Sequence, residues 1–176
     1  MEGILREYEE QDLGQMTEIW NAVVRDGDAF PQTEELNEES AREFFSSQTC
    51  TGVFEEGGEV LGLYILHPNN IGRCGHICNA SFAVKKGCRG RKIGEKLVRD
   101  CMQKGKAHGF GILQFNAVVC FNEAAIRLYE RLGFTRLGRI KNGFLLPDGT
   151  YADIFPFYIE LAQRFPGASA CPGPGA

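Results

Sequence analysis

Apolar and polar residues recur with two different periods along this chain, and segments of the two kinds follow one another. Alternation at period two predicts strands, and spacing near 3.6 residues predicts amphipathic helices. The predicted strands are residues 4–8, 51–54, 59–66, 77–84, 112–119, 135–146 and 151–161. The predicted helices are one capped by Asp12, a short one opened by Asn37 or Ser40, one over 93–108 ended by Gly109, and one from Asn122 to Gly133.

The connections between these segments predict a mixed sheet. A helical crossover joins the strands 77–84 and 112–119, which favours parallel pairing between them, whereas Gly57-Gly58 and Pro147-Asp148-Gly149 are turn signals typical of antiparallel hairpins. We therefore expect an α/β (α+β) fold of about seven strands and about four helices. The sequence predicts one domain over 1–162 and a disordered Gly- and Pro-rich tail over 163–176.

Composition excludes several functional classes. The net charge is −4 and the pI is near 5.5, which disfavours binding to nucleic acids or anionic membranes. No apolar segment reaches the roughly 18 residues of a membrane span, and the acidic start does not resemble a signal peptide, so we predict a cytoplasmic protein. The cysteines number 7, which favours reduced thiols. Cys74, His76 and Cys78 have no second set of ligands downstream, so no metal is expected.

A basic, glycine-containing loop over 85–94 precedes the third predicted helix. Unpaired main-chain amides and the helix dipole make such a helix start suitable for a diphosphate. The loop is neither a Walker A sequence nor a G-x-G-x-x-G fingerprint. A solvated loop that only aids solubility is the alternative interpretation.

Two motifs carry a family resemblance. Arg89-Gly90-Arg91-Lys92-Ile93-Gly94 resembles motif A of the GNAT superfamily of N-acetyltransferases, Arg/Gln-x-x-Gly-x-Gly/Ala, with Lys92 at the position of the first glycine. The segment 122–134 resembles motif B, Asn-x-x-Ala-x-x-x-Tyr-x-x-x-Gly-Phe. The resemblance extends over about residues 60–161. It implies that acetyl-CoA lies between two splayed parallel strands and that an amine attacks the thioester directly. A homodimer is common in this family, although the oligomeric state does not follow from the sequence.

The resemblance also implies roles for particular residues. A main-chain N–H near a bulge at Phe82 to Val84 would polarise the thioester, and Tyr129 would protonate the departing thiolate, although Tyr129 also completes an apolar helix stripe. Asn122 would cap its helix and contact coenzyme A. The residues expected to contact acetyl-CoA are Phe82, Ala83, Val84, Arg89, Gly90, Arg91, Lys92, Ile93, Gly94, Asn122 and Tyr129.

The general base and the acceptor are less constrained. Asp28, Glu34, Glu35 and Asp153 are acidic candidates for the base, each also compatible with a solvated surface position.

For the acceptor, Asn79 and Asn116 lie mid-strand on the two parallel neighbours, where amides could bind a small carboxylate or amine, and Phe30 lies in a loop over 26–36 expected to form the pocket wall. The segment 72–82 also resembles fungal acetyltransferases that act on proline analogues such as azetidine-2-carboxylate. We expect a small amine substrate. A peptide acetyltransferase and a non-catalytic acyl-CoA sensor are the alternatives.

Overall fold

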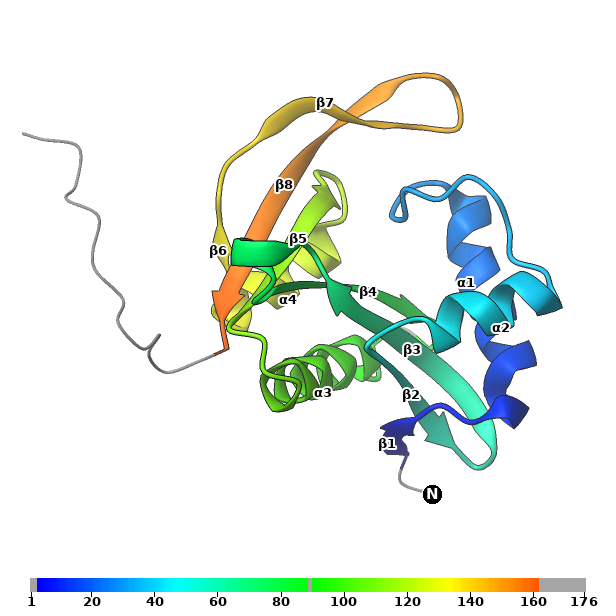
Figure 1. The fold of residues 1–176 in the computed structure, drawn as a ribbon. Coiled ribbons are helices and arrows are strands. Elements are labelled where there is room, and N and C mark those ends of the chain that lie inside the picture. Colours follow the sequence, from blue (N-terminus) through cyan, green and yellow to red (C-terminus); the bar gives the residue numbers. More distant parts are fainter. Residues whose placement is uncertain (1–2, 89, 162–176) are drawn as a thin grey trace, which may run out of the picture.

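The computed structural model describes residues 3–88 and 90–161, which form a mixed sheet with helices on both faces (Figure 1). The strand order is β1-β2-β3-β4-β5-β8-β6, and β7 also pairs with β8. The strands are β1 Ile4–Glu7, β2 Cys50–Glu56, β3 Glu59–Pro68, β4 Ile77–Val84, β5 Ile112–Val119, β6 Thr135–Arg136, β7 Ile140–Leu145 and β8 Tyr151–Glu160. The helices are α1 Leu13–Asp26, α2 Glu38–Ser46, α3 Ile93–Ala107 and α4 Glu123–Arg131. The predicted tail over 163–176 and Arg89 lie outside the described residues.

The two faces of the sheet bury separate apolar clusters. On one face, α3 packs over β2, β3 and β4, and α4 packs against β5 and β8, with Leu97, Leu113 and Phe157 fully buried in this cluster. On the other face, α1 and α2 cover β2 and β3 around Trp20 and Phe45. This arrangement confirms the predicted fold class, with four α-helices among the described residues and the parallel strands β4 and β5 near the centre.

The strand predicted over 135–146 is wrong as a single element. Gly138 has φ +154°, a conformation that side chains disfavour, and it divides the segment into β6 and β7. Leu137 N donates to Pro156 O on β8 at 2.9 Å before the chain moves away. The sheet therefore has eight strands instead of about seven.

Asp12 stands at the predicted N-cap position of α1 but makes no side-chain cap bond, whereas Asn37 caps α2 as predicted. Asp12 instead lies buried and accepts both guanidinium N–H groups of Arg6, at 2.6 and 2.9 Å, and the main-chain N–H of Glu9 at 2.7 Å. The Arg6 guanidinium lowers the pKa of Asp12. Asn37 accepts from Ser40 N at 2.9 Å at the start of α2.

The strands β4 and β5 separate soon after they meet. Their parallel pairing consists of Ile77 with Ile112 and Cys78 with Leu113. The bulge expected near Phe82 to Val84 is absent, because β4 keeps an unbroken register with β3. The irregularity lies in β5 instead, between Phe115 and Val118. The separation leaves room for a ligand between two strands that would otherwise be joined by main-chain hydrogen bonds.

Candidate active site

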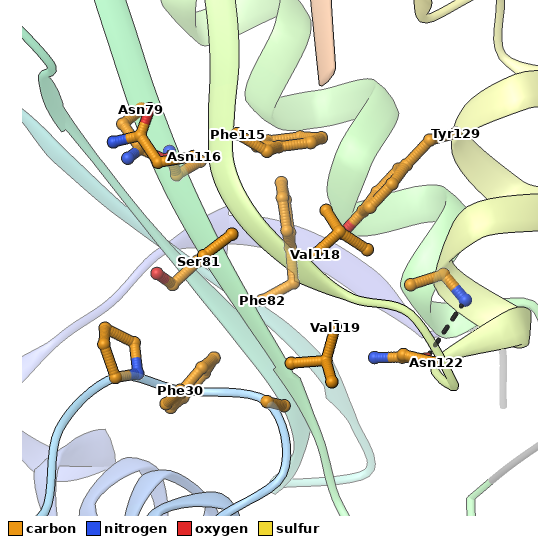
Figure 2. Close-up of a pocket in the computed structure, with 15 residues that line it drawn as sticks. Phe30, Asn79, Ser81, Phe82, Phe115, Asn116, Val118, Val119, Asn122 and Tyr129 are labelled. Carbon is orange, nitrogen blue, oxygen red and sulfur yellow. Dashed lines mark hydrogen bonds between the residues drawn. The ribbon is translucent and has the colours of Figure 1, made fainter. Parts of the chain in front are cut away.

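A pocket of about 190 Å³ occupies the opening between β4 and β5 (Figure 2). It is lined by the loop after α1, by both strands and by the start of α4. Several predicted site residues meet here; they are Phe30, Asn79, Phe82, Asn116, Asn122 and Tyr129. The opening of the sheet therefore brings together residues that lie up to 99 positions apart in the sequence, from Phe30 to Tyr129.

Main-chain N–H groups of β4 face this pocket. Lys85 N donates to Leu61 O on β3 at 2.9 Å. Because main-chain N–H groups alternate in direction along a strand, the N–H of Ala83 also points toward β3. Phe82 and Val84 point the opposite way, toward β5, beyond the last paired residues of the two strands. Phe82, which lines the pocket, and Val84, two residues further along the same edge, are thus the available main-chain donors, whereas the N–H of Ala83 points to β3. Contact of Ala83 with acetyl-CoA stays a prediction.

An aromatic cluster fixes the side chain of Tyr129. Its ring centroid lies 4.5 Å from that of Phe115, 5.5 Å from that of Phe134 and 5.7 Å from that of Phe157. Figure 2 shows the hydroxyl end directed toward Val118 and the pocket. Burial raises the pKa of Tyr129, which keeps the phenol protonated at neutral pH. The packing role and the acid role are therefore compatible, because the ring contacts the core while the oxygen faces the pocket.

Four side-chain amides form a continuous chain at the end of the pocket nearest the paired residues. The Nδ2 groups of Asn79 and Asn116 both donate to Asn69 Oδ1, at 3.3 and 2.7 Å. Asn79 Oδ1 accepts from Ala80 N at 2.7 Å, and Asn116 Oδ1 accepts from Gln114 Nε2 at 3.0 Å. Sequence reasoning missed Asn69 and Gln114, because Asn69 lies in a turn-like Pro-Asn-Asn segment and Gln114 in an ordinary strand pattern.

The main-chain N–H of Ala80 determines which end of each linked side-chain amide is oxygen and which is nitrogen. Ala80 N can only donate, so the atom of Asn79 that faces it is the oxygen, and Asn79 turns its amide nitrogen toward Asn69. The facing atom of Asn69 is then oxygen, and Asn116 in turn presents nitrogen to it. Each of the three asparagine oxygens therefore accepts at least one hydrogen bond, and Asn69 Oδ1 accepts two. Asn79 and Asn116 each keep one Nδ2 N–H, which suits a carboxylate or carbonyl oxygen.

The start of α3 provides main-chain donors at the other end of the site. No side chain caps this helix, and its first helical bond runs from Lys96 N to Lys92 O at 3.1 Å. The N–H groups of Ile93 and Gly94 precede that bond. Lys92 has φ +58° and ψ +20°, a left-handed conformation, and Gly90 has φ +83° with open space around it. The backbone thus has the form expected for an anion-binding helix start.

Most basic side chains of the loop are paired with carboxylates. Arg91 Nη2 lies 2.5 Å from Glu56 Oε2 and Lys86 Nζ lies 2.7 Å from Asp26 Oδ1, while Lys85 pairs with Glu59. Lys92 is exposed and forms no ion pair with the rest of the described chain. The positive charge available to a ligand at this loop is consequently smaller than the sequence suggests.

None of the acidic candidates for a base lines the pocket. Arg25 Nη1 lies 2.5 Å from Glu35 Oε2 at the surface. Asp153 accepts from Asn142 N at 2.9 Å and pairs with Arg139, and these contacts lower its pKa. Asp28 and Glu34 also lie outside the lining. Within the described residues, the lining contains neither a carboxylate nor an imidazole.

The arrangement of a split parallel pair, an uncapped helix start and a tyrosine in the pocket agrees with a family model. Residues 13–134 match the model described as the acetyltransferase (GNAT) family. The chain belongs to this family of acetyltransferases. This acetyltransferase is also 31% identical to the N-acetyltransferase aca1 of Schizosaccharomyces pombe over 170 residues, covering 86% of this chain and 81% of that protein.

Solved structures agree with the fold of this acetyltransferase. A GCN5-related N-acetyltransferase from Kribbella flavida has a TM-score of 0.82 at 29% identity, covering 90% of this chain and 97% of that one. A phosphinothricin acetyltransferase from Sinorhizobium meliloti, solved in complex with acetyl-CoA, has a TM-score of 0.86 at 22% identity, covering 97% of this chain and 94% of that one. The predicted enzyme class, an N-acetyltransferase, is confirmed.

Proposed function

We propose that this enzyme transfers the acetyl group of acetyl-CoA directly to the amine of a small amino-acid-like acceptor, such as a proline analogue. The observation that carries the proposal is the pocket between β4 and β5, in which unpaired main-chain donors, the Tyr129 hydroxyl and a cluster of amide N–H groups face one space. Its volume of about 190 Å³ suits a small acceptor beside an acetyl group.

The chain's own groups supply the main steps. The N–H groups of Ile93 and Gly94 bind the diphosphate of acetyl-CoA, and Asn122, whose Oδ1 accepts from Ala125 N at 3.3 Å, keeps its amide N–H groups for the pantetheine arm. The N–H group of Phe82, which lines the pocket, stabilises the negative oxygen that develops as the amine attacks the thioester carbon. Tyr129 donates its proton to the sulfur as the carbon–sulfur bond breaks, and the proton that the attacking nitrogen loses as the amide forms restores the phenol through water.

The acceptor is recognised at the opposite end of the pocket. The leftover N–H groups of Asn79 and Asn116 bind its carboxylate, and Phe30 closes the apolar side. Neither a carboxylate nor an imidazole lines the described part of the pocket, so the acceptor ammonium loses its proton to water before attack. An amine of low pKa is then the better substrate, since more of it is neutral at pH 7.

A screen of amines tests this proposal. The enzyme is incubated with acetyl-CoA and a panel of amino acids, proline analogues, simple amines and lysine peptides, and mass spectrometry reports acetylated products while a thiol reagent reports free coenzyme A. We expect acetylation of small amines that carry a carboxylate. Products formed only from peptides would identify a peptide acetyltransferase, and binding of acetyl-CoA without thiol release across the panel would identify a sensor.

Two further expectations accompany this proposal. The described helices include none long and apolar enough to cross a membrane. The cytoplasmic location and the homodimer predicted above stay predictions, which fractionation and sedimentation measure.

A further inference from the structure

Asn69 occupies the place where the main-chain connection between β4 and β5 ends. The last paired residues of the two strands are Cys78 and Leu113. One residue further on β4 and three further on β5, the side chains of Asn79 and Asn116 both donate to Asn69 Oδ1, at 3.3 and 2.7 Å. In the part of the chain that the structure describes, this oxygen makes the hydrogen-bonded link between the strands beyond their paired end. One side-chain oxygen thus links the two strands where main-chain hydrogen bonds between them have ended.

Asn69 itself is held from the neighbouring strand. Pro68 is the last residue of β3 and pairs with Cys78, and Asn69 N donates to Ile77 O at 2.8 Å. The ring of Pro68 further restricts the chain just before this contact. Asn69 is half-buried, so its carbonyl oxygen is presented from a fixed backbone. The position of this oxygen therefore sets how far apart the two donor side chains lie.

We propose that Asn69 is the positioning residue of the acceptor site: it holds Asn79 and Asn116 at a fixed separation and, by accepting one N–H from each, fixes the direction of the N–H that each has left. This inference rests on the proposed function above. If Asn69 Oδ1 were absent, both Nδ2 groups would lose their shared partner, and both side chains would gain rotational freedom. The Asn69 side chain is also uncharged, so it places no negative charge beside an anionic acceptor.

The substitution Asn69→Asp separates these two contributions. A carboxylate still accepts from both amides, so the strands stay linked, but it adds a negative charge and removes two N–H groups. We expect KM for a carboxylate-bearing acceptor to rise about tenfold or more, because like charges repel in a partly desolvated site. We expect KM for the methyl ester of the same acceptor to change less than threefold. Asn69→Ala should lower kcat/KM for both compounds, because it removes the link itself.

Asn70→Asp is the matched control. Asn70 is exposed and adjacent, and the same charge there should leave both KM values within twofold of those of the wild type. Thermal unfolding of each variant reports whether it folds, and acetyl-CoA affinity by calorimetry should be unchanged in all three.

If Asn69→Ala leaves kcat/KM unchanged for both compounds, the positioning role of Asn69 is refuted while the proposed activity stands. If Asn69→Asp affects acid and ester equally, or affects neither, the requirement for a neutral amide at this position is refuted. If Asn70→Asp changes KM for the acid as much as Asn69→Asp does, a general charge effect replaces the specific one. Absence of acetylation by the wild-type enzyme across the panel would refute the proposed function and this inference with it.

Discussion

Replacing Lys92 by glycine should stabilise the fold. Lys92 has φ +58°, and the left-handed region costs a residue with a Cβ atom about 1–2 kcal/mol. Glycine avoids this cost but loses about 0.4–1 kcal/mol through the greater freedom of the unfolded chain. Because Lys92 makes no ion pair with the described residues, little else is lost. The net gain is about 0.5–1 kcal/mol, which corresponds to a rise in Tm of about 1–4 °C.

The affinity for coenzyme A distinguishes the effect of the Lys92 backbone conformation from the effect of the Lys92 charge. Lys92→Ala keeps a Cβ atom in the left-handed conformation and removes the ammonium, so it serves as the control. Both variants should lose affinity for coenzyme A if the ammonium binds phosphate, with a larger loss at low salt than at high salt. If closer backbone approach matters more, Lys92→Gly alone should bind more tightly. Calorimetry measures affinity, and urea unfolding measures stability.

One result would refute the strain argument. If Lys92→Gly is no more stable than Lys92→Ala, then the left-handed conformation at the start of α3 carries no measurable cost. An equal Tm for the two variants within 0.5 °C, about 0.1–0.2 kcal/mol for a chain of this size, would be that result.

Three other predictions follow from the described contacts. Tyr129→Phe should lower kcat by about 100-fold with acetyl-CoA affinity unchanged, because the ring keeps its aromatic contacts and only the proton donor is lost; steady-state kinetics with unchanged turnover would exclude the acid role. Asp12→Asn should lower the free energy of unfolding by about 2 kcal/mol at pH 7, because it weakens the bonds from Arg6. The pKa of Asp12 is lower in the folded protein than its value near 4 in the unfolded chain. Its contribution to stability is therefore present above about pH 4 and is lost as the pH falls through the folded pKa. A stability difference between wild type and Asp12→Asn that stays constant down to pH 2 in urea unfolding would contradict this. Asn122→Ala should cost about 1 kcal/mol through the lost cap of α4 and weaken acetyl-CoA binding, whereas Asn122→Ser should keep most of the stability; equal Tm values for the two would contradict the cap.

The fold was largely predictable from the sequence because its elements carry strong local signals. Alternation in the strand 77–84, the amphipathic stripe of the helix 93–108 and the crossover between the two parallel strands are all confirmed. The errors lie where tertiary contacts override a local pattern. Asp12 has the chemistry of a helix cap, but a nearby Arg6 attracts its carboxylate, and the single strand expected over 135–146 divides at Gly138.

The candidate site was predictable only in part. Asn122 and Tyr129 were found because they match a motif of the family that the sequence resembles, and both line the pocket. Asn69 was not, because its relevance depends on β3 returning the chain beside two strands that separate, which no periodicity encodes. The charge of the basic loop was overestimated for the same reason, since Glu56 and Asp26 approach it only in the folded chain.

We propose that the opening between β4 and β5 binds the thioester and the acceptor together. A crystal structure of the enzyme with coenzyme A and an N-acetylated amino acid tests this most directly. We predict that the diphosphate contacts the N–H groups at the start of α3, that the sulfur lies within hydrogen-bond distance of Tyr129 Oη, and that the product carboxylate contacts Asn79 and Asn116. A structure with the two strands closed together, or with coenzyme A bound away from Tyr129, would contradict the claim.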